Sequence, residues 1–306
     1  NYGNAFSGTF LGGGHKISNL YFEKSLSKLT QNIGLFANIG TGGYVEGINL
    51  VSGYLHNENA NTYLAGIAGI NAGTIVSCHN GADVYGESYI AGIAANASGV
   101  IVKCSNSGTI GFAGTASRGS TYGGIAAMAK NIIANCYNTG TISVAALEGK
   151  AINAGGIVGI MQKNYTVRTS DILFNCYSSG NIVRSASATS SGPIYGAYKS
   201  LTPRNNYFLK TDAINSGYSD GVGSAAMDAA QLKAAAGTLG AAFCADTANV
   251  NGGYPMLNWE ATGKMDPSEL EGISIVSAEA SSSAITLTLD RRLLYSTLTA
   301  SDFTVE

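Results

Sequence analysis

One short phrase recurs four times in this chain, and the recurrence limits the folds that the chain can adopt. The phrase has two small residues, an isoleucine and a further small or aliphatic residue, and it occupies residues 65–68, 91–94, 123–126 and 155–158. A cysteine follows each copy, twelve residues after the second small residue in the first three copies and twenty residues after it in the fourth. Self-similarity with a period of about 20–50 residues is typical of stacked repeats.

The cysteine position defines a register that extends beyond these four copies. We interpret its members as a structural ladder, in which each side chain stacks on its equivalent in the next repeat. The seven members, separated by 28, 30, 26, 32, 40 and 30 residues, are Leu20, Ile48, Cys78, Cys104, Cys136, Cys176 and Asn206.

The segments within each repeat have the pattern of short strands. Residues 73–78, for example, contain β-branched residues and follow a glycine, and no repeat has a helical period long enough for a crossover helix. A unit of about 30 residues cannot bury its own apolar face, so stacking on its neighbours must supply the core. We therefore predict an all-β fold, a parallel β-helix of about seven coils with equivalent residues about 4.8 Å apart. A propeller is the alternative, although its blades need four strands and about 40–50 residues.

The chain divides into three predicted regions. Residues 1–210 form the β-helix, and residues 211–262 form a capping segment with one helix, an Ala-rich run at 225–236 that Gly237 ends. Residues 268–306 contain β-rich segments that we interpret as the first strands of an Ig-like domain, since a complete one needs about 100 residues.

The segment Phe6–Leu20 reads Phe-Ser-Gly-Thr-Phe-Leu-Gly-Gly-Gly-His-Lys-Ile-Ser-Asn-Leu, and it resembles the opening coil of GLUG-repeat proteins. The later Gly-Gly-Ile-Val-Gly and Asn-Cys-Tyr-x-x-Gly phrases resemble the repeat unit of that family, and residues 251–259 resemble the usual end of its arrays. The resemblance covers residues 5 to about 260. It implies an extracellular scaffold within a large bacterial surface or secreted protein, often beside Ig-like modules, and it brings no catalytic residues. Leu11 stands where an acidic residue often stands in the family, which argues against a metal-binding role for that turn.

Composition excludes several classes of function. Charged residues make up 12% of the chain and the formal net charge is −2, so the basic surface of a nucleic-acid-binding protein is missing. No run approaches 18 apolar residues, and we expect no membrane insertion. The five cysteines lack the paired spacing of metal sites, so we expect buried thiols, no metal and no cofactor. The three histidines are scattered, and packing is the expected role of each.

Two groups of residues remain as candidates for chemistry. Asp83 and Glu87 are the best-placed acids for a polysaccharide-degrading enzyme, although solvated loop charges are the favoured interpretation. Tyrosines near repeat positions can dock sugar rings through their apolar faces, and the alternative is that they stack on one another between coils, as we favour for Tyr137 and Tyr177. The proposed ligand-binding tyrosines are Tyr85, Tyr89, Tyr122 and Tyr195.

The sequence therefore predicts a non-catalytic scaffold or adhesin-like module, exported to the cell surface, whose partners are glycans or another copy of the chain. Two alternatives stay open. One is a polysaccharide-degrading β-helix enzyme, and the other is a subunit of an extracellular filament that assembles by strand addition at the unfinished C-terminal strands.

Overall fold

The computed structural model of the chain describes residues 5–24, 30–114, 119–144, 151–162, 173–184, 190–198, 203–211, 223–263, 275–280 and 285–289. The chain divides into two compact units, residues 1–264 and 265–306. In the second unit, β33 (Ile275–Ala280) and β34 (Ile285–Leu289) pair antiparallel. These two strands are the described part of the predicted Ig-like region.

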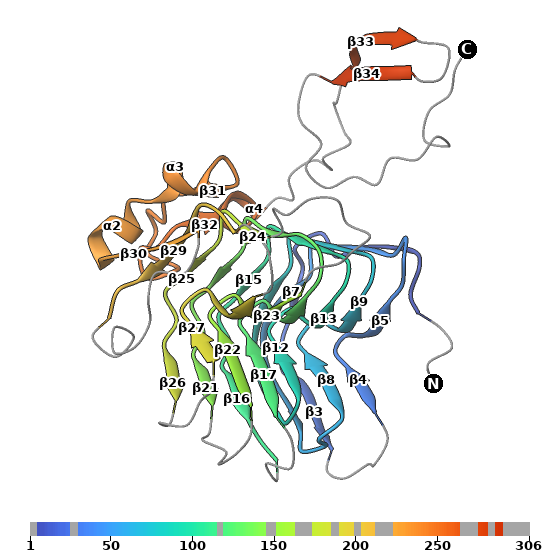
Figure 1. Cartoon of the computed structure of the whole chain (residues 1–306), viewed down its shortest axis with the longest axis vertical. Coiled ribbons are helices and arrows are strands. Elements are labelled where there is room, and N and C mark those ends of the chain that lie inside the picture. Colours follow the sequence, from blue (N-terminus) through green and yellow to red (C-terminus); the bar gives the residue numbers. More distant parts are fainter. Residues whose placement is uncertain are drawn as a thin grey trace. The chain divides into compact units, whose positions relative to one another are not determined.

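The first unit contains four parallel sheets, which the chain visits in turn in each coil (Figure 1). Sheet I consists of β1 (Thr9–Leu11), β6 (Tyr44–Glu46), β10 (Thr74–Val76), β14 (Val100–Val102), β19 (Ile133–Ala134) and β24 (Leu173–Phe174). Sheet II consists of β2 (Lys16–Ile17), β3 (Leu20–Lys24), β7 (Asn49–Asn57), β11 (His79–Gly86), β15 (Ser105–Asn106), β16 (Ile110–Phe112), β20 (Tyr137–Asn138), β21 (Ile142–Val144), β25 (Tyr177–Ser178), β26 (Ile182–Arg184), β29 (Asn206–Leu209) and β30 (Ser224–Met227). Sheet III consists of β4 (Gln31–Ile33), β8 (Thr62–Ala65), β12 (Tyr89–Ala91), β17 (Ser120–Gly123), β22 (Ile152–Gly155) and β27 (Ser190–Gly192). Sheet IV consists of β5 (Phe36–Ile39), β9 (Ala68–Asn71), β13 (Ala94–Ala97), β18 (Ala126–Ala129), β23 (Val158–Met161) and β28 (Tyr195–Tyr198).

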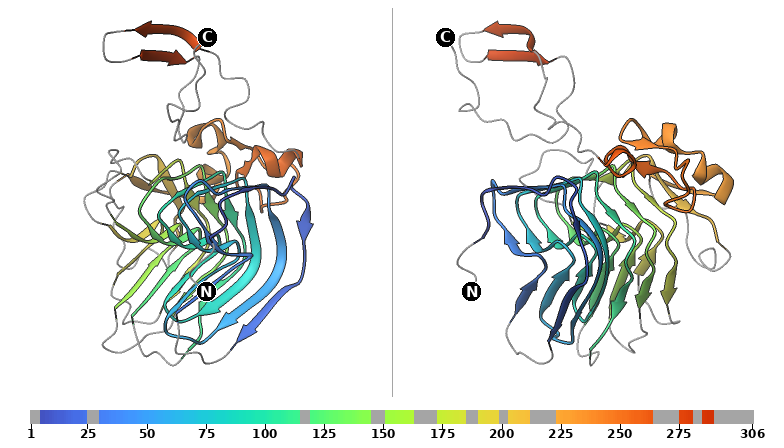
Figure 2. Two further views of the ribbon diagram at one scale, coloured as in Figure 1. Left: turned by 90° about the vertical axis from the view of Figure 1, so that its right-hand side faces the viewer. Right: turned by 180° about the vertical axis from the view of Figure 1, so that it is seen from behind.

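Each strand pairs with the equivalent strand of the coils before and after it. In sheet I, for example, Ile75 is the partner of Val45 on one side and of Ile101 on the other. Figure 2 shows the resulting stack, in which strands of successive coils lie side by side. The predicted class, a mostly β chain built from parallel sheets, is confirmed, and the arrangement is consistent with an all-β parallel solenoid.

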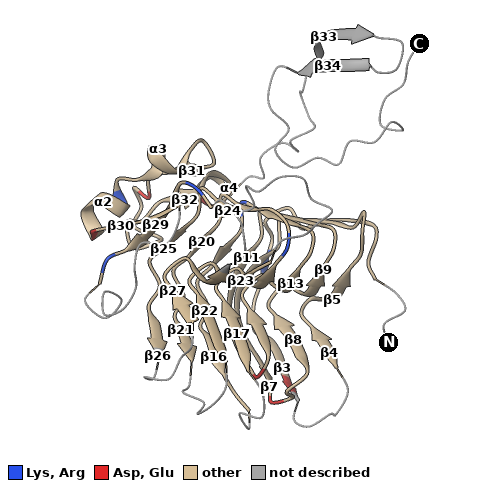
Figure 3. Ribbon diagram, in the orientation of Figure 1, with Lys and Arg blue, Asp and Glu red and all other residues tan. Residues whose placement is uncertain are grey.

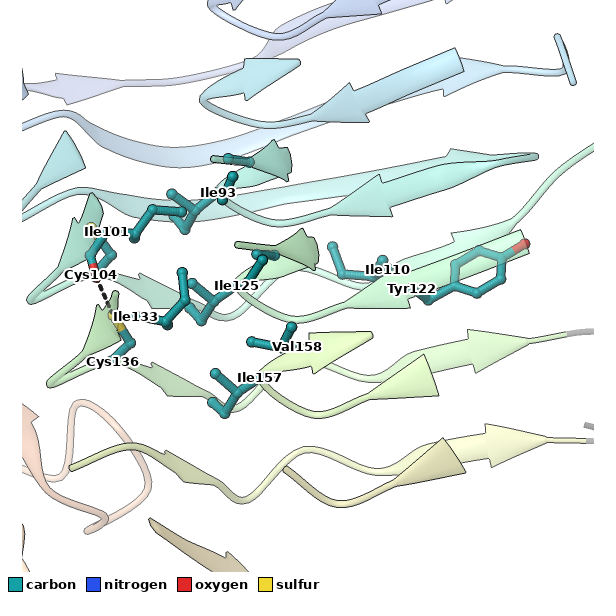
Figure 4. Close-up of a cluster of buried hydrophobic side chains, with 14 of the residues drawn as sticks. Ile93, Ile101, Cys104, Ile110, Tyr122, Ile125, Ile133, Cys136, Ile157 and Val158 are labelled. Carbon is teal, nitrogen blue, oxygen red and sulfur yellow. Dashed lines mark hydrogen bonds between the residues drawn. The ribbon is translucent and has the colours of Figure 1, made fainter. Parts of the chain in front are cut away.

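Columns of aliphatic side chains fill the interior. The isoleucine of the recurring phrase forms one such column between sheets III and IV, and none of its members is more than 1% exposed: Ile67, Ile93, Ile125, Ile157 and Ile194. Figure 4 shows Ile93, Ile125 and Ile157 in line. The glycine before each of the first four isoleucines allows close approach of the coils, since a Cβ on Gly92 would lie 2.3 Å from the carbonyl oxygen of Gly124.

The four ladder cysteines form a second column, and all are free and fully buried. Each thiol donates to the carbonyl two residues before it, as from Cys104 to Val102 at 3.2 Å, and the amide of Cys78 donates to the sulfur of Cys104 at 3.4 Å. Asn206 takes the next rung, where its Oδ1 accepts a 3.1 Å hydrogen bond from the amide of Cys176. The column therefore alternates side chains with backbone groups of the neighbouring coil.

The residue before each rung makes the turn from sheet I into sheet II and has a positive φ. The six such residues from the second coil onward are Gly47, Ser77, Lys103, Asn135, Asn175 and Asn205, with φ between 49° and 71°. Asparagine tolerates this left-handed conformation better than most residues, which explains the recurring Asn-Cys-Tyr phrase. The three asparagines also bond to one another, since Asn205 donates to Asn175 at 2.7 Å and Asn175 donates to Asn135 at 3.1 Å.

Leu20 does not lie on the ladder, and this part of the predicted register is wrong. Leu20 is the partner of Gly53, whereas Lys16 is the partner of Asn49, so the position next to Ile48 belongs to His15. The physical reason is the glycine turn before His15. Gly14, with φ of 74°, supplies the left-handed residue of the first coil, and its amide bonds to Gly47 at 2.8 Å.

The segment after the last coil differs from the single predicted helix. Ser224–Met227 is strand β30, and α2 (Ala229–Lys233) begins only after Asp228, whose side chain accepts a 2.9 Å hydrogen bond from the amide of Gln231. A second short helix, α3 (Ala236–Leu239), contains Gly237 instead of ending at it. Then come β31 (Phe243–Cys244), β32 (Met256–Leu257) and α4 (Asn258–Thr262), where β31 pairs with β32. The residues described between 223 and 263 thus contain three helices.

Candidate functional site

The two acids proposed as a catalytic pair have different surroundings. Asp83 lies on β11, where its Oδ1 accepts a 2.7 Å hydrogen bond from the backbone amide of Thr109 in the next coil. Glu87 follows the end of β11, and its side chain is fully buried. Glycosidase acids must face their substrate as a pair, and the buried carboxylate of Glu87 cannot do so beside the half-buried Asp83. The structure therefore offers no support for this pair as a catalytic centre.

The four tyrosines proposed as glycan contacts do not share one surface. Tyr122 and Tyr195 are 1% and 8% exposed, so this part of the prediction is wrong. The cause is the register, because Tyr122 is the strand partner of the buried Ile90 and Tyr195 is the partner of the buried Val158. Both rings therefore point into the core.

Tyr85 and Tyr89 are half-buried and lie on different sheets. The ring of Tyr85 lies 5.8 Å from that of Tyr54 on sheet II, and the ring of Tyr89 lies 4.9 Å from that of Tyr63 on sheet III. Both contacts join neighbouring coils. The two tyrosines thus contribute to ladders of the kind that the sequence left open as the alternative to glycan binding.

Two exposed aromatic residues belong to the ladder on sheet II. Tyr21 is 66% exposed and Tyr54 is 37% exposed, and their rings stack with 6.1 Å between centroids and 25° between planes. Sugar rings dock on the open face of an aromatic ring, and stacked rings cover one another's faces. Stacking therefore covers ring faces between neighbouring coils and favours packing, while the ring of Tyr21 in the first coil stays largely exposed.

A different cluster concentrates the polar chemistry of the chain. The residue after each ladder cysteine faces outward from sheet II, and strand pairing aligns these residues in a row that we call the flank column: His79, Ser105, Tyr137 and Tyr177. Tyr137 and Tyr177 stack with 5.1 Å between centroids and 7° between planes, which confirms the stacking expected for this pair. Residues 243–262, from β31 to α4, pack on this column, and we call them the clasp.

Glu260, on α4, inserts its carboxylate into the flank column. Its Oε2 accepts hydrogen bonds from the hydroxyl of Tyr137 at 2.8 Å and from the amide of Leu257 at 3.1 Å, and its Oε1 bonds to the hydroxyl of Ser105. The Oγ of Ser105 also lies 2.8 Å from Nδ1 of His79, which is 3.7 Å from Oε1 of Glu260. A single carboxylate thus joins residues from three successive coils.

Further contacts hold the clasp on either side of Glu260. The indole N–H of Trp259, a buried residue, donates to the carbonyl of Lys103 at 2.9 Å. The hydroxyl of Tyr177 donates to the carbonyl of Pro255, and the side chain of Asn251 donates to that hydroxyl at 2.8 Å. The clasp is therefore held by hydrogen bonds to several coils of the solenoid, in addition to the pairing of β31 with β32 within the clasp.

Burial controls the charge of this cluster in a chain where charges are sparse (Figure 3). Burial raises the pKa of Glu260 to about 7, against the hydrogen bonds from Ser105 and Tyr137, which lower it. Burial also lowers the pKa of His79 to about 4. Between these two values, the protonated acid and the neutral imidazole are the favoured forms.

The exposed hydroxyl of Ser107 lies 3.3 Å from Nε2 of His79, an arrangement that resembles a nucleophile beside its base. Two observations argue against nucleophilic catalysis. An imidazole with a pKa of about 4 is a weak base at neutral pH. The amides of Ser107 and Gly108 both donate to the carbonyl of Asn80, so neither points at an oxyanion. The cluster is suited to holding the clasp.

Sequence reasoning missed Glu260 as a partner of the flank column. The register itself contains a usable signal, because it places His79, Ser105 and Tyr137 directly after successive rungs and so on one outward row. Nothing in the repeat indicates that an acid at position 260 meets this row, since 155 residues separate Glu260 from Ser105.

Within the described ranges, no group of three or more His, Cys, Asp or Glu side chains is arranged to hold a metal ion. The helices described are too short to cross a membrane. Comparison of the chain with protein-family models, with curated proteins and with solved structures finds no match.

Proposed function

We propose that this chain is a non-catalytic scaffold module of a bacterial surface protein, with about seven coils of GLUG-like repeats followed by the start of an Ig-like module. The proposal combines the resemblance of the repeats with the continuous stack of coils in the first unit. β33 and β34 fit the first hairpin of an Ig-like sandwich. An exported, multidomain fibre is the setting in which we expect such a module to act.

The observation that carries the proposal is a hydrogen-bonded asparagine ladder inside the stack. The side-chain amide of Asn80 donates to Oδ1 of Asn106 at 2.7 Å, and that of Asn106 donates to Oδ1 of Asn138 at 2.7 Å. All three side chains are fully buried, and each amide also donates to the carbonyl two residues later. A ladder that is internally satisfied supports a rigid rod, because these three successive coils are joined by side chains as well as by backbone.

Three of the described acids support the non-catalytic part of the proposal. Asp83 is engaged with a backbone amide, Glu87 is buried, and Glu260 is enclosed by its own clasp. The ladder cysteines suit export, since buried thiols are protected from oxidation.

A glycan array followed by product analysis tests this function. The purified chain is incubated with a broad panel of polysaccharides, and released oligosaccharides are measured by mass spectrometry, with the Asp83→Asn/Glu87→Gln double variant as the matched sample. We expect no product from either protein. Product from the wild-type chain that the double variant fails to make would establish the polysaccharide-degrading alternative instead.

A further inference from the structure

Glu260 lies outside the coils, and its carboxylate is enclosed by side chains of the flank column, which together with it we call the Glu260 cluster. Its neighbours come from β11, β15 and β20, and α4 supplies both the acid and the helix that covers it. The basic group that faces the carboxylate is the imidazole of His79, 3.7 Å away. Burying an ionised carboxylate and an imidazolium together costs more desolvation than burying the same two groups uncharged.

The distances allow a complete chain of hydrogen bonds when both groups are uncharged. The protonated Oε1 of Glu260 donates to Oγ of Ser105, and the hydroxyl of Ser105 donates to Nδ1 of His79, 2.8 Å away. The N–H at Nε2 of His79 then donates to Oγ of Ser107 at 3.3 Å. Oε2 of Glu260 still accepts from Tyr137 and Leu257, so every polar atom of the chain keeps a partner.

We propose that docking of the clasp transfers a proton from His79 to Glu260 through Ser105, so that the clasp closes on an uncharged pair. The imidazolium gives its Nδ1 proton to Oγ of Ser105, and Ser105 passes its own proton to Oε1 of Glu260. The products are a neutral imidazole with its proton on Nε2 and a carboxylic acid, and the number of protons is unchanged. This inference goes beyond the scaffold role and does not depend on it.

The other titratable groups that face Glu260 are the hydroxyls of Tyr137 on β20 and Tyr177 on β25 and the thiol of Cys244 on β31. Behind the column lies the buried thiol of Cys136, whose pKa is lowered by hydrogen bonds within the cysteine column against the effect of burial. Burial and the nearby Glu260 raise the pKa values of Tyr137, Tyr177 and Cys244 above their ordinary values. The exchange is therefore assigned to His79 and Glu260, the two groups that the hydroxyl of Ser105 joins directly.

Proton exchange has a specific consequence for the pH dependence of docking. The raised pKa of Glu260 strengthens docking below its ordinary value of 4.5, and this gain is lost as the pH rises to about 7. The lowered pKa of His79 strengthens docking above its ordinary value of 6.5, and this gain is lost as the pH falls to about 4. Between pH 4.5 and 6.5 the two effects cancel, because the pair holds one proton whether the clasp is docked or open.

Trp259 makes the test direct, because it is the only tryptophan of the chain and its indole N–H is bonded in the docked clasp. In the whole chain, the rate of hydrogen exchange at that indole gives the equilibrium constant for opening of the clasp, which is measured between pH 4 and 8. For the wild type we expect a change of no more than about threefold from pH 4.5 to 7. For Glu260→Gln, docking strengthens about 80-fold from pH 4 to 6.5, and for His79→Gln it weakens about 80-fold from pH 4.5 to 7.

His56→Gln is the matched control, because His56 lies 3.9 Å from Glu58 in a histidine–glutamate pair outside the clasp. It should leave the wild-type profile unchanged. The proposal would be overturned if the opening constants of the single variants depended on pH as little as that of the wild type. It would also be overturned if the wild-type constant depended on pH as steeply as that of either variant. If both variants release the clasp at every pH, nitrogen NMR of the wild type at pH 5.5 decides. A neutral His79 protonated on Nε2 supports the exchange, and an imidazolium refutes it.

Discussion

Replacing Asn106 by leucine tests how much the internal asparagine ladder stabilises the stack of coils. The side chain makes three short hydrogen bonds: it donates to Asn138 at 2.7 Å and to the carbonyl of Gly108 at 2.8 Å, and it accepts from Asn80 at 2.7 Å. Leucine has a similar size, so the substitution removes these bonds without opening a large cavity.

The expected loss in free energy of unfolding depends on which hydrogen bonds the partners of Asn106 retain after the substitution. Asn80 still donates to the carbonyl of Ala82 at 2.9 Å, and Oδ1 of Asn138 still accepts from the amide of Gly140 at 3.2 Å, so neither group is orphaned. Three bonds at about 0.5–1.5 kcal/mol each give a loss of about 1.5–4.5 kcal/mol. Tight packing adds to it, since a Cβ on Gly92 would lie 2.4 Å from Oδ1 of Asn106, which leaves little room for a branched side chain.

Native-state hydrogen exchange is the assay, because the stability of a solenoid is a sum over neighbouring coils and a single global transition need not occur. The loss should be concentrated at amides of the adjacent coils, such as that of Tyr137, which donates to the carbonyl of Cys104. Asn96→Leu is the control, since Oδ1 of Asn96 is buried with no hydrogen-bond partner, and its replacement should change stability by less than about 0.5 kcal/mol. A loss below about 1 kcal/mol for Asn106→Leu, or an equal loss in both variants, would refute the reasoning.

Two glycines and the cysteines give further predictions. Gly108→Ala should destabilise the surrounding coils by at least about 3 kcal/mol in native-state hydrogen exchange, since its Cβ would lie 2.0 Å from the carbonyl oxygen of Ala82. Gly237→Ala should instead stabilise the fold by about 0.5–1 kcal/mol, because Gly237 lies inside α3 with nothing within 4 Å of a new Cβ. A thiol reagent such as Ellman's reagent should modify only Cys244 in the native chain and all five cysteines in denaturant; fast modification of several native thiols would contradict the buried column.

The solenoid could be predicted from the sequence because equivalent positions in the repeat indicate which residues stack on one another. The isoleucine of the recurring phrase and the cysteine eleven residues later in the first three copies occupy equivalent positions in successive coils, and both are buried. The ladder position of the first coil was predicted wrongly because its turn depends on backbone conformation. Gly14 and Asn19 both have a positive φ, and spacing alone cannot tell which of them precedes the ladder position.

The orientation of single side chains was harder to predict than the fold. Tyr122 matches the exposed tyrosines in type, yet its strand position is that of Ile90, which faces the core. The position of Glu260 depends on contacts between residues that lie more than a hundred positions apart, for which a repeat pattern contains no signal. Local spacing therefore predicts the columns, and tertiary contacts determine what covers them.

The flank column also explains how the clasp finds one place on a repetitive wall. An ideal repeat would present the same side chain after every rung, and a docking segment could then bind one coil higher or lower with equal energy. Here the successive residues differ, as His79, Ser105 and Tyr137. Glu260 bonds to the hydroxyls of Ser105 and Tyr137 and reaches the imidazole of His79 through Ser105. A shift by one coil would place its carboxylate beside Ser105, Tyr137 and Tyr177, without the imidazole. The loss of repetition in this column therefore sets the register of the clasp, just as repetition inside the solenoid sets the register of the coils.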